Sequence, residues 1–177
     1  MEKRMLGIGD LVKMQNNDTV VWTVLGSCVS VIFHIPGFFS LMCHAQLPLS
    51  NKELHAGQFN ADPNDRRRYI HVDTVLAKMM TLVRENNIPI SSVDVSLLGG
   101  AGVLRDTGSQ FAVGAKNVDV AKKILAENGY IIRREITGGK NGITVWYNPK
   151  INEITVRHHA ETTELDLSAL YEIDFYR

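Results

Sequence analysis

The 177-residue sequence has no long hydrophobic run, no excess of either charge and only two cysteines. No apolar stretch approaches the roughly eighteen residues that indicate a transmembrane helix. The charged start at Met1 is not followed by the apolar segment and small-residue cleavage site of a signal peptide. Lysine plus arginine equals aspartate plus glutamate, 19 each, whereas nucleic-acid binders usually carry a basic surplus. These absences predict a cytoplasmic protein that neither inserts into a membrane nor binds nucleic acid.

The length is typical of one domain with a substantial core. Hydrophobic residues make up 45% and charged residues 21% of the chain, as in ordinary globular proteins. The sequence contains no internal repeat and no low-complexity segment. In a reducing compartment we expect Cys28 and Cys43 to be free thiols rather than a disulfide.

Extended and helical patterns occur in groups rather than in strict alternation, which predicts an α+β fold. One helix is expected over 69–86, with Val72, Val75, Leu76, Met79 and Val83 on a single face. A second is expected over 118–128, capped by Asn117 and Gly129. A polar surface loop is expected over 50–68. Strands are expected over 5–13, 19–25, 28–35, 40–47, 93–98, 130–136, 143–147 and 153–158.

Cys28 and His44 are the residues most suited to catalysis. Cys28 follows the turn-prone pair Gly26-Ser27, and a thiolate is the nucleophilic form of cysteine. An imidazole titrates near neutral pH, which suits a general acid and base. Cys43 and His44 are neighbours on an expected strand and should point to opposite faces, so we interpret Cys43 as a core residue. The alternative for Cys28 is a purely structural role as a small core residue.

A regular hairpin raises a geometric objection to this pair. If Ile35 pairs near Ser40, Cys28 lies opposite Leu47 or Pro48. His44 is then about 10–13 Å away, at roughly 3.3 Å per residue. The hairpin and the pair conflict unless the chain bends at Cys28 or the two segments pair in another register.

Two other kinds of site have weak support. The glycine-rich stretch at 99–102 lacks the ending of a P-loop and the spacing of a dinucleotide motif, so we expect close backbone packing there rather than nucleotide binding. Cys28, His34, Cys43 and His44 match no standard zinc spacing, so no metal is expected.

Five short motifs point to one family. Thr23-Val24-Leu25-Gly26-Ser27-Cys28-Val29 is followed by a segment that ends in His44-Ala45-Gln46-Leu47-Pro48. The others are Gly7-Ile8-Gly9-Asp10, Leu98-Gly99-Gly100-Ala101, Val113-Gly114-Ala115-Lys116-Asn117-Val118 and Thr137-Gly138-Gly139. With these motifs, over about residues 5–158, the chain resembles the CheD family of chemoreceptor glutamine deamidases.

The resemblance implies a CheD-like domain over 1–160, with a β-sandwich-like core flanked by helices. It implies that Cys28 is the nucleophile, His44 the general acid and base, and Thr23 the residue that orients His44. The implied reaction hydrolyses glutamine side-chain amides to glutamate and ammonia through a Cys28 thioester, without a cofactor. The implied substrates are the cytoplasmic domains of chemoreceptors (methyl-accepting chemotaxis proteins), and the chemotaxis phosphatase CheC is an implied partner.

Two departures from the family pattern are visible. Thr23 lies five residues before Cys28, whereas some family members place the threonine six residues before the cysteine. Ile143 stands near a position where the family often has arginine. The resemblance does not extend to the C-terminal extension 161–177, for which a docked helix is one interpretation. Two rival functions remain open: a binding partner of CheC, with or without catalysis, and another cysteine hydrolase such as a protease or thioesterase.

Overall fold

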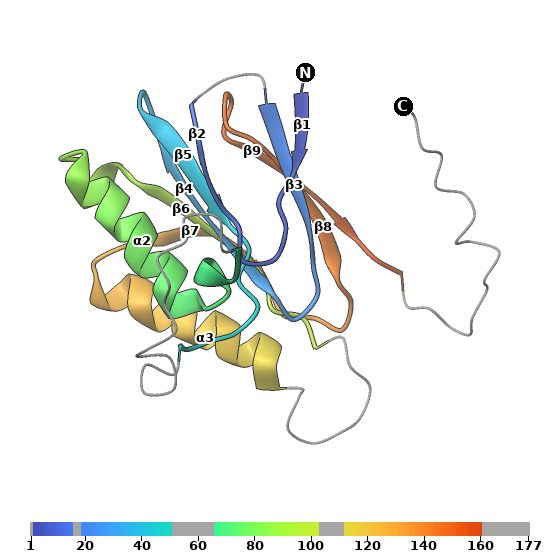
Figure 1. The fold of residues 1–177 in the computed structure, drawn as a ribbon. Coiled ribbons are helices and arrows are strands. Elements are labelled where there is room, and N and C mark those ends of the chain that lie inside the picture. Colours follow the sequence, from blue (N-terminus) through green and yellow to red (C-terminus); the bar gives the residue numbers. More distant parts are fainter. Residues whose placement is uncertain (1, 16–18, 51–65, 103–111, 161–177) are drawn as a thin grey trace.

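The computed structural model describes residues 2–15, 19–50, 66–102 and 112–160. Within these residues the chain forms two mixed sheets and two α-helices, which confirms the expected α+β class (Figure 1). The four-stranded sheet has the order β1 (Glu2–Met5), β3 (Thr19–Leu25), β8 (Ile143–Asn148), β9 (Glu153–His158). The five-stranded sheet has the order β2 (Leu11–Met14), β5 (Phe39–Cys43), β4 (Val29–Ile35), β6 (Asp94–Gly99), β7 (Ile132–Thr137).

The helices α2 (Val72–Glu85) and α3 (Ala112–Glu127) lie on one side of the five-stranded sheet, and the four-stranded sheet lies on the other (Figure 1). Two short 3₁₀ helices, η1 (Arg66–Tyr69) and η2 (Ile90–Ser92), complete the described elements. The helix α3 connects the parallel strands β6 and β7. Three layers result, and the central sheet is covered on both faces.

The strand β4 shows why this sheet is central. All seven of its residues are buried, as expected for a strand with a core on each side. Val29, Val31, Phe33 and Ile35 pack in the core shared with the helices. Ile32, on the opposite face, packs with Cys28 in the core between the two sheets.

The prediction of a single N-terminal strand over 5–13 is wrong. The chain instead forms β1 in one sheet and β2 in the other, separated by a turn at Gly7–Asp10. The Asp10 carboxylate accepts a 2.8 Å hydrogen bond from the Gly7 N–H, and Gly9 has a φ of 81°. A positive φ is easily adopted only by glycine, so this motif moves the chain between sheets.

Most other expected elements are present with shifted ends. The pattern of buried residues on α2 is confirmed. The hairpin β8–β9 is confirmed, as is the left-handed Gly129 after α3. The polar loop expected at 50–68 lies mostly outside the described residues, and Arg66–Tyr69 at its end form η1 rather than loop. No described helix has the length and apolar character needed to cross a membrane.

Candidate active site

Cys28, His44 and Thr23 come from both sheets. Cys28 stands directly before β4 and His44 directly after β5, in the five-stranded sheet. Thr23 lies on β3 of the four-stranded sheet. All three are buried, with exposed fractions of 9%, 4% and 1% respectively. The candidate site is therefore assembled across the interface between the sheets.

The observed register differs from the one on which the geometric objection to a Cys28–His44 pair was based. Ile35 pairs with Phe39 rather than Ser40, and the same register continues to the bridge between Val29 and Ala45. Cys28 is thus opposite Gln46, and His44 is its diagonal neighbour on the same face. Diagonal neighbours are about 7–8 Å apart at their backbones, which is nearer than the 10–13 Å of the assumed register. The assumption that Ile35 pairs near Ser40 is wrong, because the hairpin turn is one residue tighter.

The hydroxyl of Thr23 determines which nitrogen of His44 carries a proton. Thr23 Oγ1 lies 2.8 Å from the Leu6 carbonyl oxygen and 2.8 Å from His44 Nδ1. The carbonyl can only accept, so the single hydroxyl proton is donated to Leu6. His44 Nδ1 must then donate to Thr23 Oγ1. This leaves His44 Nε2 unprotonated in the neutral ring and able to accept a proton.

His44 Nε2 is buried and has no hydrogen-bond partner within the described part of the chain. Leaving a buried acceptor unpaired costs about 1–3 kcal/mol. The backbone of His44 is held firmly, because its N–H donates to Asp10 O at 3.0 Å and its carbonyl accepts from Gly9 N at 2.8 Å. The ring is thus anchored at its backbone and at Nδ1, while Nε2 stays available.

Burial favours the neutral forms of both groups. It raises the pKa of the Cys28 thiol, against a smaller lowering by that residue's own backbone N–H. Burial also lowers the pKa of His44, although the Leu6 carbonyl and the Asp10 carboxylate act in the opposite direction. Both shifts oppose a thiolate–imidazolium ion pair.

Asn117 holds together the segments that carry Cys28 and His44. Its Nδ2 donates at 2.9 Å to Ser27 O and at 2.9 Å to Gln46 O. The expectation that Asn117 is an N-cap is wrong, since α3 begins at Ala112 and Asn117 lies inside it. Helix propensity could not distinguish these roles, because a polar residue before an apolar stretch fits either position.

The glycine-rich stretch packs against the backbone of the Cys28 turn, as expected. Gly100 N donates to Cys28 O at 2.8 Å, and Ala101 N donates to Gly26 O at 2.8 Å. A Cβ atom on Gly99 would collide with Cys28 O. On its other side the stretch touches α3, where a Cβ on Gly114 would lie 2.6 Å from Gly100 O.

A pocket of about 210 Å³ opens beside this stretch, between the ends of β6, β7 and the start of β8. Its lining includes Gly99, Ala101, Ile136, Lys140, Ile143 and His158. Gly99 is the ladder partner of Val29, so the pocket borders the backbone next to Cys28. Ile143, which stands near the family's arginine position, contributes an apolar wall here.

Cys43 does not belong to this site. It is fully buried in the core on the helix side of the sheet, where its sulfur accepts from Val31 N at 3.4 Å. Burial raises its thiol pKa to about 12. The prediction that Cys43 is a core residue is confirmed. No group of His, Cys, Asp and Glu side chains suited to a metal occurs among the described residues.

The chain is similar to proteins of one family. The family described as "CheD chemotactic sensory transduction" matches residues 53–158. This range begins after Cys28 and His44, so the match includes neither residue. "Probable chemoreceptor glutamine deamidase CheD 2" of Geobacter sulfurreducens is 32% identical over 84% of each chain. "Chemoreceptor glutamine deamidase CheD" of Thermotoga maritima is 26% identical over 95% of this chain and 99% of its own length. A relative from Pyrococcus horikoshii is 29% identical over 91% and 95%.

Proposed function

Because the chain belongs to the CheD family, we propose that it is a chemoreceptor glutamine deamidase with Cys28 as its nucleophile. The names of the relatives in Geobacter and Thermotoga indicate this activity. The observation that carries the assignment to these residues is the 2.8 Å contact between Thr23 Oγ1 and His44 Nδ1. A protein that only docks a partner has no need of a buried imidazole held in one tautomer.

The first half of the proposed reaction forms a thioester. Cys28 Sγ attacks the carboxamide carbon of a receptor glutamine while its proton passes to His44 Nε2. Backbone N–H groups of the turn at Gly26–Cys28 are the candidates to stabilise the oxyanion. The carbon–nitrogen bond then breaks, and His44 gives its proton to the departing ammonia.

The second half releases glutamate. His44 Nε2 takes a proton from water, whose oxygen attacks the thioester carbon. The carbon–sulfur bond breaks and Cys28 recovers its proton from His44. One water is consumed and one ammonia released per glutamine, with no cofactor. The substrate groups lie on the cytoplasmic domain of the receptor, so we place the activity in the cytoplasm.

The test uses the cytoplasmic fragment of a chemoreceptor and mass spectrometry, because deamidation adds about one mass unit per glutamine converted by this hydrolysis. The native chain should convert specific glutamines, and Cys28→Ala should abolish conversion with an unchanged fold. Cys43→Ala is the matched control and should retain activity per folded molecule. Iodoacetamide should also label Cys28 before Cys43, since the latter is fully buried with a pKa of about 12.

Each rival function has its own signature in this experiment. Full deamidation by Cys28→Ala would remove Cys28 from the mechanism. Peptide-bond cleavage or thioester hydrolysis without deamidation would favour a protease or thioesterase. Binding of CheC with no chemistry on any receptor fragment would favour the docking role.

A further inference from the structure

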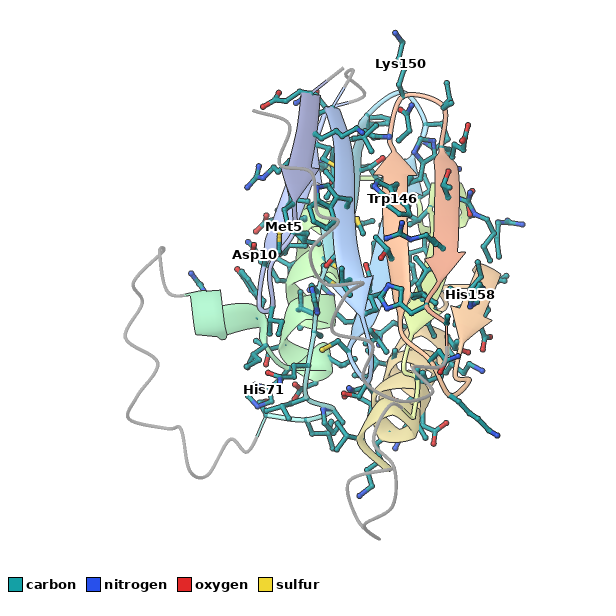
Figure 2. All side chains as sticks on the ribbon, turned by 90° about the vertical axis from the view of Figure 1, so that its right-hand side faces the viewer. Met5, Asp10, His71, Trp146, Lys150 and His158 are labelled. Atoms are coloured by element: carbon teal, nitrogen blue, oxygen red, sulfur yellow. The ribbon has the colours of Figure 1, made fainter. Side chains whose placement is uncertain are left out.

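The outer face of the four-stranded sheet carries an apolar stripe. Strand register aligns Met5, Trp22, Trp146 and Thr155 across β1, β3, β8 and β9. Their neighbours on β3 and β8 pack inward instead, as shown by Val21 and Tyr147 in the core between the sheets. Figure 2 looks onto this face, with Met5 and Trp146 labelled.

None of the described helices or strands covers this stripe. Met5 is 60% exposed and Val24, in the next row, 45% exposed, while both tryptophans are half-buried. Both helices lie beyond the other sheet and pack in the other core (Figure 1). Contiguous exposed apolar surface that contains tryptophan is typical of an interaction site.

The charge of the face is mildly positive. Arg157 lies in the same row as Val24 and Thr144, and its guanidinium stands 5.6 Å from the ring centroid of Trp146. Lys3 is aligned with Val20 on the same side of β1. Glu153 is the acidic residue that shares this side of β9. An acidic segment with apolar side chains would complement this arrangement.

Residues 161–177 have that composition. They contain five acids and one arginine. Between 171 and 175, Tyr171, Ile173 and Phe175 alternate with Glu172 and Asp174, a pattern that would separate an apolar side from an acidic side in an extended chain. The segment also contains Leu165, Leu167 and Leu170.

The segment starts at the right place and is long enough. It follows β9, an edge strand of this same sheet, whose last residue is His158. At about 3.3 Å per extended residue, 17 residues reach roughly 55 Å, whereas four strands span roughly 15 Å. We propose that residues 161–177 dock on this outer face, with their apolar side chains on the Met5–Trp22–Trp146 stripe and their acids near Lys3 and Arg157.

Intrinsic fluorescence tests this directly, because Trp22 and Trp146 are the two tryptophans of the chain and both belong to the stripe. Replacement of Tyr171, Ile173 and Phe175 by serine in the full chain removes the apolar side of the segment. We expect a longer emission wavelength and roughly twofold stronger acrylamide quenching, as both indoles lose apolar cover. The matched control, Thr162→Ser with Thr163→Ser and Ser168→Ala, changes as many positions and should leave both readings unchanged.

A peptide of native sequence 161–177, added to the triple-serine chain, should restore the native spectrum, and the same peptide with the three serines should not. Unchanged emission and quenching in the triple-serine chain would overturn the proposal. So would a native spectrum that shifts on dilution, which would identify a second copy of the chain as the occupant. The experiment does not involve deamidation, so its outcome is independent of the proposed function.

Discussion

At the scale of single residues, the Thr23 hydroxyl can donate one hydrogen bond, and it donates to the Leu6 carbonyl at 2.8 Å. Thr23→Val keeps the branched shape and removes the acceptor for His44 Nδ1–H. We expect kcat to fall roughly 10- to 100-fold, the range seen when the partner that orients a functional histidine is lost, with KM little changed. The assay is deamidation of a receptor fragment under saturating and limiting substrate.

The control is Thr144→Val on the same sheet. Thr144 is also buried and its hydroxyl lies 2.8 Å from a histidine nitrogen, that of His159. This variant should keep its kcat. A Thr23→Val variant within threefold of the native rate would show that Thr23 does not orient the His44 imidazole, and the Leu6 carbonyl, 3.5 Å from Nδ1, would be the next candidate.

The pH dependence follows from the burial of His44. Burial lowers the pKa of the imidazole from its ordinary 6.5, so the ring remains a base at pH values below 6.5. The acid limb of kcat/KM should therefore inflect below pH 6.5, with activity lost as the pH falls through the folded pKa. His44→Ala should lose this inflection and about 10²-fold or more of the rate. An inflection above pH 6.5 that survives in His44→Ala would assign it to another group.

At the scale of elements, α3 positions the site through one side chain. Asn117→Asp keeps the shape but replaces two N–H donors by a carboxylate facing the carbonyls of Ser27 and Gln46. We expect a loss of at least about 1–3 kcal/mol in unfolding free energy, the cost of unpaired buried groups, and a lower kcat per folded molecule. Urea unfolding and deamidation measure the two effects.

Asn128→Asp is the control for this helix, because Asn128 is exposed and its Nδ2 donates to Ile124 O. It should change neither kcat nor stability by a comparable amount. If the Asn117→Asp variant unfolds at the same urea concentration as the native chain and turns over at the native rate, the two hydrogen bonds of Asn117 have no such role.

The sequence predicts those elements whose local pattern agrees with their surroundings. The face of α2 around Leu76 and the alternation of β3 required only periodicity. The sequence does not predict the break between β1 and β2. Apolar residues occur on both sides of Gly7–Asp10, so the local pattern looks continuous where the chain changes sheets. Alternation alone does not say which side of β3 is covered; contacts with the facing sheet bury Thr23 and leave Trp22 half-buried on the outer side.

The three candidate site residues could be named from the family resemblance, but their geometry could not. The relation between Cys28 and His44 depends on a hairpin register that differs by one residue from the expected one. The roles of the Leu6 carbonyl and Asn117 depend on contacts between residues 17 and 90 positions apart. No local pattern specifies such contacts.

At the scale of the whole molecule, stability should depend on a second buried histidine. His34 Nδ1 lies 3.0 Å from both Ser40 Oγ and Tyr147 Oη, between the two sheets. Burial lowers its pKa from 6.5, with Asp94 acting to raise it and Arg134 to lower it. The unfolded chain binds this proton more readily, so stability is fully present above pH 6.5 and declines as the pH falls toward the folded pKa.

We therefore expect the unfolding free energy to be flat above pH 6.5 and to fall below it, by urea titration at a series of pH values. His34→Gln keeps a polar side chain without this titration and should show a smaller fall. His44 contributes in the same direction, so part of the slope will remain. A variant whose slope equals that of the native chain would exclude His34 as a source of the pH dependence.

Under the proposed mechanism, the adjacency of Cys43 and His44 would make enzymatic turnover a measure of correct strand register. Because neighbouring side chains on a strand point to opposite faces, a slip of β5 by one residue against β4 would send the imidazole into the helix-side core and bring the wrong thiol toward Thr23. Such a misfolded molecule would keep nearly the same secondary structure and yet be inert. Specific activity would thus count correctly registered molecules in a preparation that circular dichroism reports as uniform.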